Sequence, residues 1–506
     1  VTLDDVAHLA PCDAYLAPLQ AKIAAYRTLY GRLFQISTEE GMSVYLTMDV
    51  MFYNDQLRQL LGNSRTRAIR WLGGCLDRLL RDFPAVAGII MRFGETDGVD
   101  VQGDFRSRML LKHPRHAREF LSALFPVFER HRRLLIFRTW SVGAYRIGDL
   151  MWNERTFNHV FQGLDSPALL ISMKYGESDF FRYLPLNRLF FASDHQKIIE
   201  FQARREYEGF GRYPSFVGWD AETHLQQLKS ARNMVGASVW CQTGGWGKLR
   251  QLTFLRNSSK WVELNAFVLA RLWQGATCEE ALGEYVAEHM PEVPAARLVQ
   301  FLRLSDDVIK DLLYIREFAE RRLYFRRLRL PPQLYTFWDR IVVDSTMRTV
   351  LGHLVQDPAA AIEQGQAALA KLQQMLQLAE TYGIPTKGLK FQLATFQLLA
   401  ASREYFFQPS SQAVVVRLLE QKKEYKSRFR RSYSVKLNFE GDTRHKLHVR
   451  WLIALMLRDR SRYRLLDQVL TLRLLAWGFR LASRLGLRVG PKFAHRQAMG
   501  LEALFR

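Results

Sequence analysis

The chain has 506 residues, 48% of them hydrophobic, and a formal net charge of +22. This length suits one large domain with a second beside it, and no run of eighteen uncharged apolar residues indicates a membrane-spanning helix. Four cysteines lie far apart in the sequence, at Cys12, Cys75, Cys241 and Cys278. Their spacing argues against a metal cluster or a disulfide framework, so we expect no metal site and no cofactor.

From residue 1 to about residue 275, short apolar runs alternate with helical patterns such as RAIRWLGGCLDRLLRDFP. Continuous apolar runs suit parallel strands that are buried on both faces of a sheet. The runs are SVYLTMD (Ser43–Asp49), AGIIMRF (Ala87–Phe93), LLIFRTW (Leu134–Trp140), ALLISMKY (Ala168–Tyr175), IIEFQARRE (Ile198–Glu206) and GASVWCQ (Gly236–Gln242). This alternation predicts an α/β fold, either a (β/α)8 TIM-like barrel or an open doubly wound sheet.

Polar and aromatic residues lie at the ends of these runs or within a few residues after them. They are Asp49, Glu95, Arg138, Lys174, Asp179, Glu206 and Trp246. In βα barrels the active site is built at that end of the strands, whereas the glycine-rich GxGxxG of a nucleotide-binding Rossmann fold is missing after an early strand. The pattern therefore favours a barrel with a site at the carboxyl ends of its strands.

After residue 275 the pattern becomes helical. In the stretch that begins at residue 357, Asp357 is the expected N-cap and Pro358 occupies the first turn. We therefore predict a catalytic barrel over residues 1–275, an all-α carboxy-terminal domain over 276–410 and a basic α-helical extension over 411–506.

The positive charge is concentrated in the extension. Residues 411–506 hold 22 Lys and Arg against 7 Asp and Glu, a net charge of +15. The extension could contact a polyanion or a membrane surface, or it could pack on the barrel with Arg side chains that reach to solvent. The rest of the chain is only mildly basic, and no nucleic-acid partner is expected.

Three carboxylates follow three different strands: Glu95 in RFGETDG, Asp179 in KYGESDF and Glu206 in QARREYEG. Paired carboxylates serve glycoside hydrolysis because one donates a proton while the other accepts one. The alternative is that they are surface acids or ion-pair partners, since Glu206 adjoins Arg204 and Arg205.

Two motifs point to a known family. One strand run carries Lys174, Gly176, Asp179 and Phe180, and the next carries Glu200, Phe201, Gln202, Glu206 and Tyr207. In order and spacing these segments, together with GIIMRFGETDG and FRTWSVG, resemble glycoside hydrolase family 67, the α-glucuronidases. The resemblance runs from about Leu3 to Met290.

The resemblance implies roles for the residues that match. It implies an inverting, exo-acting hydrolase with Glu95 as general acid and Asp179 or Glu206 as general base. It also implies that Arg138 and Lys174 bind a sugar carboxylate, although Arg138 could instead pair with an acid inside the barrel. Arg92, Trp140 and Trp246 are further candidates for substrate contact, the two tryptophans by stacking on a sugar or alternatively as core residues.

The sequence also departs from the family. Met91 replaces the lysine four residues before the acid, a residue is missing between Asp179 and Glu206, and Glu177, which the motif does not need, is expected at the rim of the site. Six full strands are visible, with Val1–Leu3 as the end of another, so the chain is expected to be an amino-terminally truncated barrel. No signal peptide is visible, which favours a cytoplasmic location.

The sequence thus predicts a glycoside hydrolase that acts on an acidic, uronic-acid-bearing oligosaccharide. The alternative is a non-catalytic, degenerate barrel that binds an acidic polysaccharide or another polyanion through its basic tail.

Overall fold

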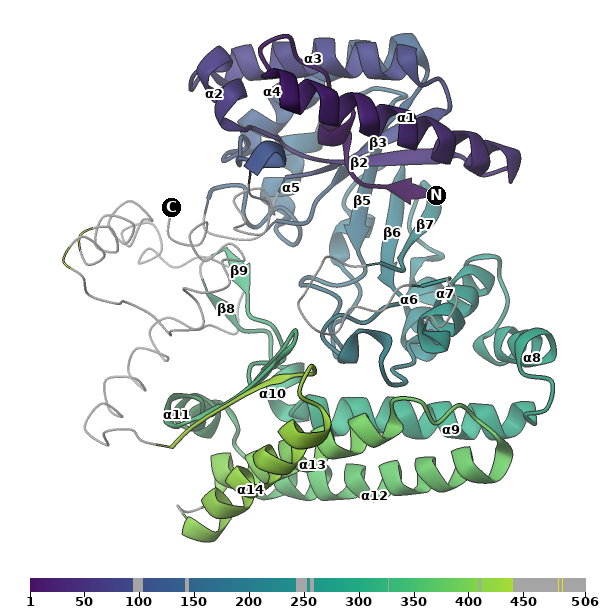
Figure 1. Cartoon of the computed structure of the whole chain (residues 1–506), viewed down its shortest axis with the longest axis vertical. Coiled ribbons are helices and arrows are strands. Elements are labelled where there is room, and N and C mark those ends of the chain that lie inside the picture. The colour runs from purple at the N-terminus through teal and green to yellow at the C-terminus, as the bar shows by residue number, and fades with distance from the viewer. Residues whose placement is uncertain are drawn as a thin grey trace.

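A parallel sheet of seven strands forms the amino-terminal half of the computed structural model, which describes residues 1–93, 103–141, 145–242, 253–254, 259–325, 327–408, 411–439, 481 and 485 (Figure 1). The strands follow one another in chain order across the sheet. They are β1 (Thr2–Leu3), β2 (Val44–Asp49), β3 (Val86–Arg92), β4 (Leu134–Arg138), β5 (Leu169–Lys174), β6 (Lys197–Gln202) and β7 (Met234–Trp240). The six apolar runs and the strand end at Val1–Leu3 are therefore confirmed, and the sheet is curled like part of a TIM-like barrel.

Helices connect most of these strands and cover the outer face of the sheet. Side chains on that face, such as Met48, Ile89, Leu135 and Ile171, are fully buried against them. The connecting helices are α1 (Ala17–Glu39), α2 (Asp55–Leu61), α3 (Arg65–Asp82), α4 (Pro114–His131), α5 (Glu154–Phe161) and α6 (Gly218–Leu228). The connection from β5 to β6 differs, because it carries only a short 3-10 turn, Arg188–Phe191.

The inner face of the sheet changes from apolar to charged along the strands. Ile90, Ile136 and Leu170 form a small cluster there, separate from the main core, and Ile198 packs against it. Because side chains alternate along a strand, the residues two positions further on share this inner face. They are Arg92, Arg138, Ser172 and Glu200.

The carboxy-terminal half packs helices below the sheet, on the side toward which the carboxyl ends of β5 and β6 point (Figure 1). Helix α12 lies against both α9 and α13. The helices are α7 (Lys260–Trp273), α8 (Cys278–His289), α9 (Ala295–Val308), α10 (Arg316–Glu320), α11 (Ser345–Leu354), α12 (Pro358–Tyr382), α13 (Leu389–Phe407) and α14 (Gln412–Arg428). The predicted start of α12 is confirmed, since the Asp357 side chain accepts a hydrogen bond from the Ala360 backbone N–H.

The expectation of an all-α carboxy-terminal region is not confirmed. A hairpin of β8 (Tyr324–Phe325) and β9 (Leu328–Arg329) is followed by β10 (Thr336–Phe337) and β11 (Arg340–Asp344), and β12 (Ser434–Asn438) pairs in parallel with β11. These strands are two to five residues long, too short for their alternation to stand out beside long helical patterns. The pairing of β11 with β12 also joins the predicted regions 276–410 and 411–506 in one sheet.

Backbone contact ties the two halves together at Gly388, the residue before α13. Its φ of +94° is one that residues with side chains rarely adopt, and a Cβ there would lie 1.7 Å from the Arg212 carbonyl oxygen. Glycine thus permits the loop after β6 to touch the start of α13. Every helix in the described part of the chain is too short or too polar to traverse a lipid bilayer.

Candidate functional site at the carboxyl edge of the sheet

Asp179 lies in the loop after β5 and is held by three donors. Lys174 Nζ, at the end of β5, donates to Oδ1, as does the Phe180 backbone N–H at 2.8 Å, and the Tyr207 hydroxyl donates to Oδ2 at 2.6 Å. Burial, followed by the Asp179 charge, raises the pKa of Tyr207 far above its ordinary value, so the phenol remains a donor. Asp179 is 6% exposed and keeps about one of its roughly four acceptor positions for a further hydrogen bond.

The hydrogen bond from Tyr207 to Asp179 connects the two loops that carry the candidate bases. Tyr207 directly follows Glu206 in the loop after β6, and the Glu206 backbone N–H donates to Gln202 Oε1 at 3.0 Å. The Glu206 side chain is half-buried. Asp179 and Glu206 therefore both lie beside Tyr207 at the carboxyl edge, while their catalytic roles stay predictions.

Arg138, at the end of β4, forms a bidentate ion pair with Glu200 on β6. Its Nε and Nη2 lie 2.8 Å from the two carboxylate oxygens, and Ser172 donates to Oε1 at 2.5 Å. Burial opposes ionisation of Glu200, but the Arg138 guanidinium outweighs it and holds the pKa of that carboxyl below its ordinary value. The sequence allowed two roles for Arg138, binding a sugar carboxylate or pairing with an acid inside the barrel. The ion pair with Glu200 is the second of these.

Arg92, at the end of β3, lies among acids at the end of β2 and directly after β1. Its Nε is 3.0 Å from Asp49 Oδ1, and its Nη atoms lie 3.6 Å and 3.7 Å from Asp4 and Asp5. Burial raises the pKa of Asp5 to about 7, while Arg92 opposes the shift. Arg92 thus holds a group of acids at the edge of the sheet.

Aromatic side chains border Lys174. Its Nζ lies 3.6 Å from the centroid of the Trp140 ring, within range of a cation–π contact. Trp140 belongs to a buried cluster with Met151, Trp152 and Tyr324, and within the described part of the chain its indole N–H has no hydrogen-bond partner. Trp140 is 9% exposed, so in this structure it packs as a largely buried ring next to the charged group.

The sequence led us to expect Glu177 at the rim of the site. In the structure it is buried instead, with 7% of the residue exposed. Its Oε2 accepts a hydrogen bond of 2.8 Å from the hydroxyl of Tyr324, in the β8–β9 hairpin. The expectation was wrong because the partner comes from 147 residues further along the chain. No local pattern around Glu177 could have revealed this contact.

A second buried charge network lies where the barrel meets the helical half. Arg182 bonds to Glu208 at 3.2 Å, to Asp220 at 2.8 Å and to Asp306 of α9 at 2.9 Å, and Arg205 also bonds to Glu208. Burial opposes ionisation of Glu208, but Arg182 and Arg205 outweigh it and lower the pKa of that carboxyl to about 2. Sequence reasoning did not select Arg182, Glu208 or Asp306, since each reads as an ordinary loop or helix charge, and it considered Asp220 only for the rim of the site.

Two predicted site residues, Glu95 and Trp246, lie outside the described residues. The described residues contain no group of three or more His, Cys, Asp or Glu placed to hold a metal ion. The described part of the candidate site therefore consists of Asp179, Glu206, Arg138, Lys174, Arg92 and Trp140.

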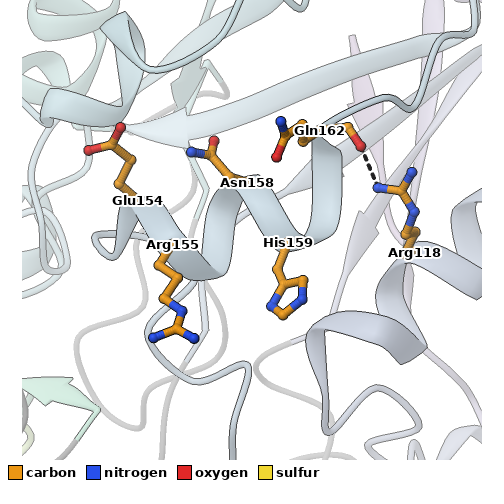
Figure 2. Close-up of a pocket in the computed structure, with 6 residues that line it drawn as sticks. All are labelled: Arg118, Glu154, Arg155, Asn158, His159 and Gln162. Atoms are coloured by element: carbon orange, nitrogen blue, oxygen red, sulfur yellow. Dashed lines mark hydrogen bonds between the residues drawn. The ribbon is translucent and has the colours of Figure 1, made fainter.

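A pocket of about 800 Å³ lies elsewhere, between α4 and α5 on the outer side of the barrel (Figure 2). Arg118 of α4 donates to the Gln162 carbonyl oxygen across it at 2.5 Å. It is lined by Arg118, Glu154, Arg155, Asn158, His159 and Gln162. It contains a single carboxylate and none of the strand-end residues, so we place the candidate site at the edge of the sheet instead.

Comparison with protein-family models and with curated proteins found no match. Among solved structures, this chain is similar to one titled CpGH84B, with 12% identity and a TM-score of 0.35 over 82% of this chain and 64% of that one. It is also similar to a chitobiase from Flavobacterium johnsoniae, FjGH20, with 10% identity and a TM-score of 0.28 over 77% of this chain. The chain spans 64% of the length of each neighbour, and at these scores neither likeness bears on the site.

Proposed function

We propose that the chain is a glycoside hydrolase of the inverting, exo-acting kind that acts on a uronic-acid-bearing glycan, as the resemblance to family 67 implies. The observation that carries the proposal is the hydrogen bond from Tyr207 to Asp179, which brings the loops after β5 and β6 together with a carboxylate on each. Inverting hydrolysis needs an acid and a base about 6.5–9.5 Å apart, with a water between the base and the sugar.

In this proposal Glu95 protonates the glycosidic oxygen as the bond to the anomeric carbon breaks. Asp179 or Glu206 takes a proton from the water that attacks the opposite face of the sugar. Asp179 already accepts three hydrogen bonds, which leaves it room to orient one water. Lys174 donates to Asp179 Oδ1 and so fixes the orientation of that carboxyl group.

The test is hydrolysis of aryl α-glucuronides by the full chain and by Glu95→Gln, Asp179→Asn and Glu206→Gln variants. Loss of a general acid or base should lower kcat by about 10²–10⁴-fold. A phenol leaving group of low pKa needs little protonation, so it should restore the activity of Glu95→Gln but not that of the base variant. Asp104→Asn, which removes an exposed carboxylate paired with Lys22, is the matched control.

Binding without turnover is the second candidate function. It is favoured by the two buried ion pairs, Lys174 with Asp179 and Arg138 with Glu200, which neutralise the charges that catalysis or uronate binding would use. The same experiment decides between them, because a degenerate barrel would bind acidic oligosaccharides and release no product from any of the aryl glycosides.

A further inference from the structure

Arg329 is a buried cation with hydrogen-bonding capacity that the protein leaves unused. It is 1% exposed, and its buried Nε and Nη1 atoms have no hydrogen-bond partner among the described residues. Arg92, Arg138 and Lys174 each have a carboxylate oxygen within 4 Å, whereas no such ion pair involves Arg329 among the described residues. A buried guanidinium with unmet hydrogen bonds is costly, and burial lowers the pKa of Arg329, while the nearby Tyr324 and Glu177 oppose that shift.

The β8–β9 hairpin places Arg329 beside the candidate site. Tyr324 and Arg329 are directly paired across the hairpin, so their side chains share one face. The Tyr324 hydroxyl reaches Glu177, three residues after Lys174, and its ring lies 4.9 Å from that of Trp152. Arg329 thus adjoins the aromatic cluster whose Trp140 ring touches Lys174.

Buried donors without a hydrogen-bond partner among the described residues lie on two side chains at this cluster. They are the indole N–H of Trp140 and two nitrogens of Arg329. A ligand that supplies acceptor oxygens would satisfy both, and an anionic oxygen would gain most because hydrogen bonds to charged groups are the stronger ones. A planar guanidinium also matches the two oxygens of a carboxylate or a sulfate.

We propose that Arg329 and Trp140 form a subsite for an anionic substituent of a sugar, a carboxylate or a sulfate ester, with the sugar ring packed on the aromatic cluster. The subsite rests on the proposed function in that its ligand is a glycan of the same site. It differs from the uronate clamp implied by resemblance, since Arg138 and Lys174 already have carboxylate partners and Arg329 comes from the helical half of the chain.

The test measures binding of D-glucuronate, D-glucose 6-sulfate and D-glucose to the full chain by titration calorimetry or ligand-observed NMR. Arg329→Met removes the charge and keeps the length, Arg329→Lys keeps the charge, and Arg322→Met is the matched control because Arg322 is a half-buried cation close to Arg329. Arg329→Met should weaken binding of one or both anions about tenfold to a hundredfold. Glucose binding should not change, and Arg329→Lys should recover part of the loss.

The two anions distinguish a carboxylate site from a sulfate site. Equal losses for glucose and the anions, the same effect from Arg322→Met, or no binding of either anion to the unchanged chain would overturn the subsite. Hydrolysis of glycosides that is insensitive to Arg329 would remove the subsite and leave the hydrolase proposal. Anion binding that depends on Arg329 without hydrolysis of any glycoside would leave the subsite and remove the hydrolase.

Discussion

Two buried charge groups both draw residues from β5, β6 and the loops that follow these strands, yet they differ in how completely their polar atoms are satisfied. In the junction network (Arg182, Arg205, Glu208, Asp220 and Asp306), Arg182 alone bonds to three carboxylates, to Ser215 Oγ and to the Phe216 carbonyl oxygen. In the strand-edge group (Arg138, Lys174, Asp179, Glu200 and Tyr207), each cation has one carboxylate partner among the described residues, and the neighbouring Trp140 and Arg329 have donors that no described residue satisfies. A satisfied network stabilises the fold, whereas unsatisfied donors mark where a ligand has something to add.

The largest effect should come from the junction network. Arg182→Met would leave the buried Glu208 with one cation fewer and would break the link between the barrel loop and α9. Removing one member of a buried ion network typically costs about 3–5 kcal/mol. The free energy of unfolding in urea should fall by that amount, and an unchanged value would mean that the network does not hold the two halves together.

Substitutions in the Arg138–Glu200 pair should lower the free energy of unfolding somewhat less than Arg182→Met does. The effects of the two single substitutions should not add. Either Arg138→Met or Glu200→Gln leaves a buried partner without its counterion, at a cost of about 3 kcal/mol. The double variant removes both charges and should recover most of that loss. Urea unfolding of the four proteins gives the coupling energy, and additive losses would show that the two side chains act independently, contrary to their 2.8 Å contacts.

Asp5 offers a pH-dependent test at the same edge. Its pKa in the folded chain is about 7, raised first by burial from 3.8, so the folded state keeps a proton that the unfolded chain releases. The stability that this proton provides is present below pH 4 and is lost as the pH rises to about 7. Relative to Asp5→Asn, the unchanged chain should therefore lose roughly 1–3 kcal/mol between pH 5 and pH 8.

Urea unfolding of both proteins at a series of pH values makes that comparison. The Asn side chain does not titrate, so it removes the ionisation of Asp5 and leaves the other acids near Arg92 in place. Parallel stability curves for the two proteins would contradict a raised pKa at Asp5.

How far the sequence predicts this molecule depends on how local each signal is. The strands β2 to β7 were predictable because their apolar runs are continuous, and the inner-face charges Arg138 and Lys174 were found because they end those runs. The Asp357 cap and Pro358 lie next to each other, so the start of α12 was also readable. Each of these signals is contained within about ten residues.

Signals that depend on distant partners were not predictable. The sequence around Arg138 would be the same whether Arg138 bound a substrate or paired with an acid of the protein. In the structure it pairs with Glu200, which lies 62 residues further along the chain. Tyr324 and Arg329 lie in an arginine-rich segment, RRLYFRRLRLPP, whose short strands resemble a charged helix end. Only the folded chain brings that segment to Glu177 and Trp140.

The smallest change in the free energy of unfolding should come from substitution of Arg329. The sign of that change distinguishes a buried cation with unsatisfied donors, such as Arg329, from a fully bonded one, such as Arg182. Arg182 gains enough from its partners to offset the cost of burial, whereas two buried nitrogens of Arg329 have no hydrogen-bond partner in the part of the chain that the structure describes. Arg329→Met should therefore change the free energy of unfolding by about 0–1 kcal/mol, toward greater stability, because an apolar chain replaces a buried charge that has no ion-pair partner within 4 Å among the described residues. Lys22→Ala, which breaks the exposed ion pair with Asp104, sets the scale for a neutral change at less than about 1 kcal/mol of lost stability. A loss of stability for Arg329→Met as large as that for Arg182→Met would show that Arg329 is a structural cation like Arg182, and the contrast between the two charge groups would fail.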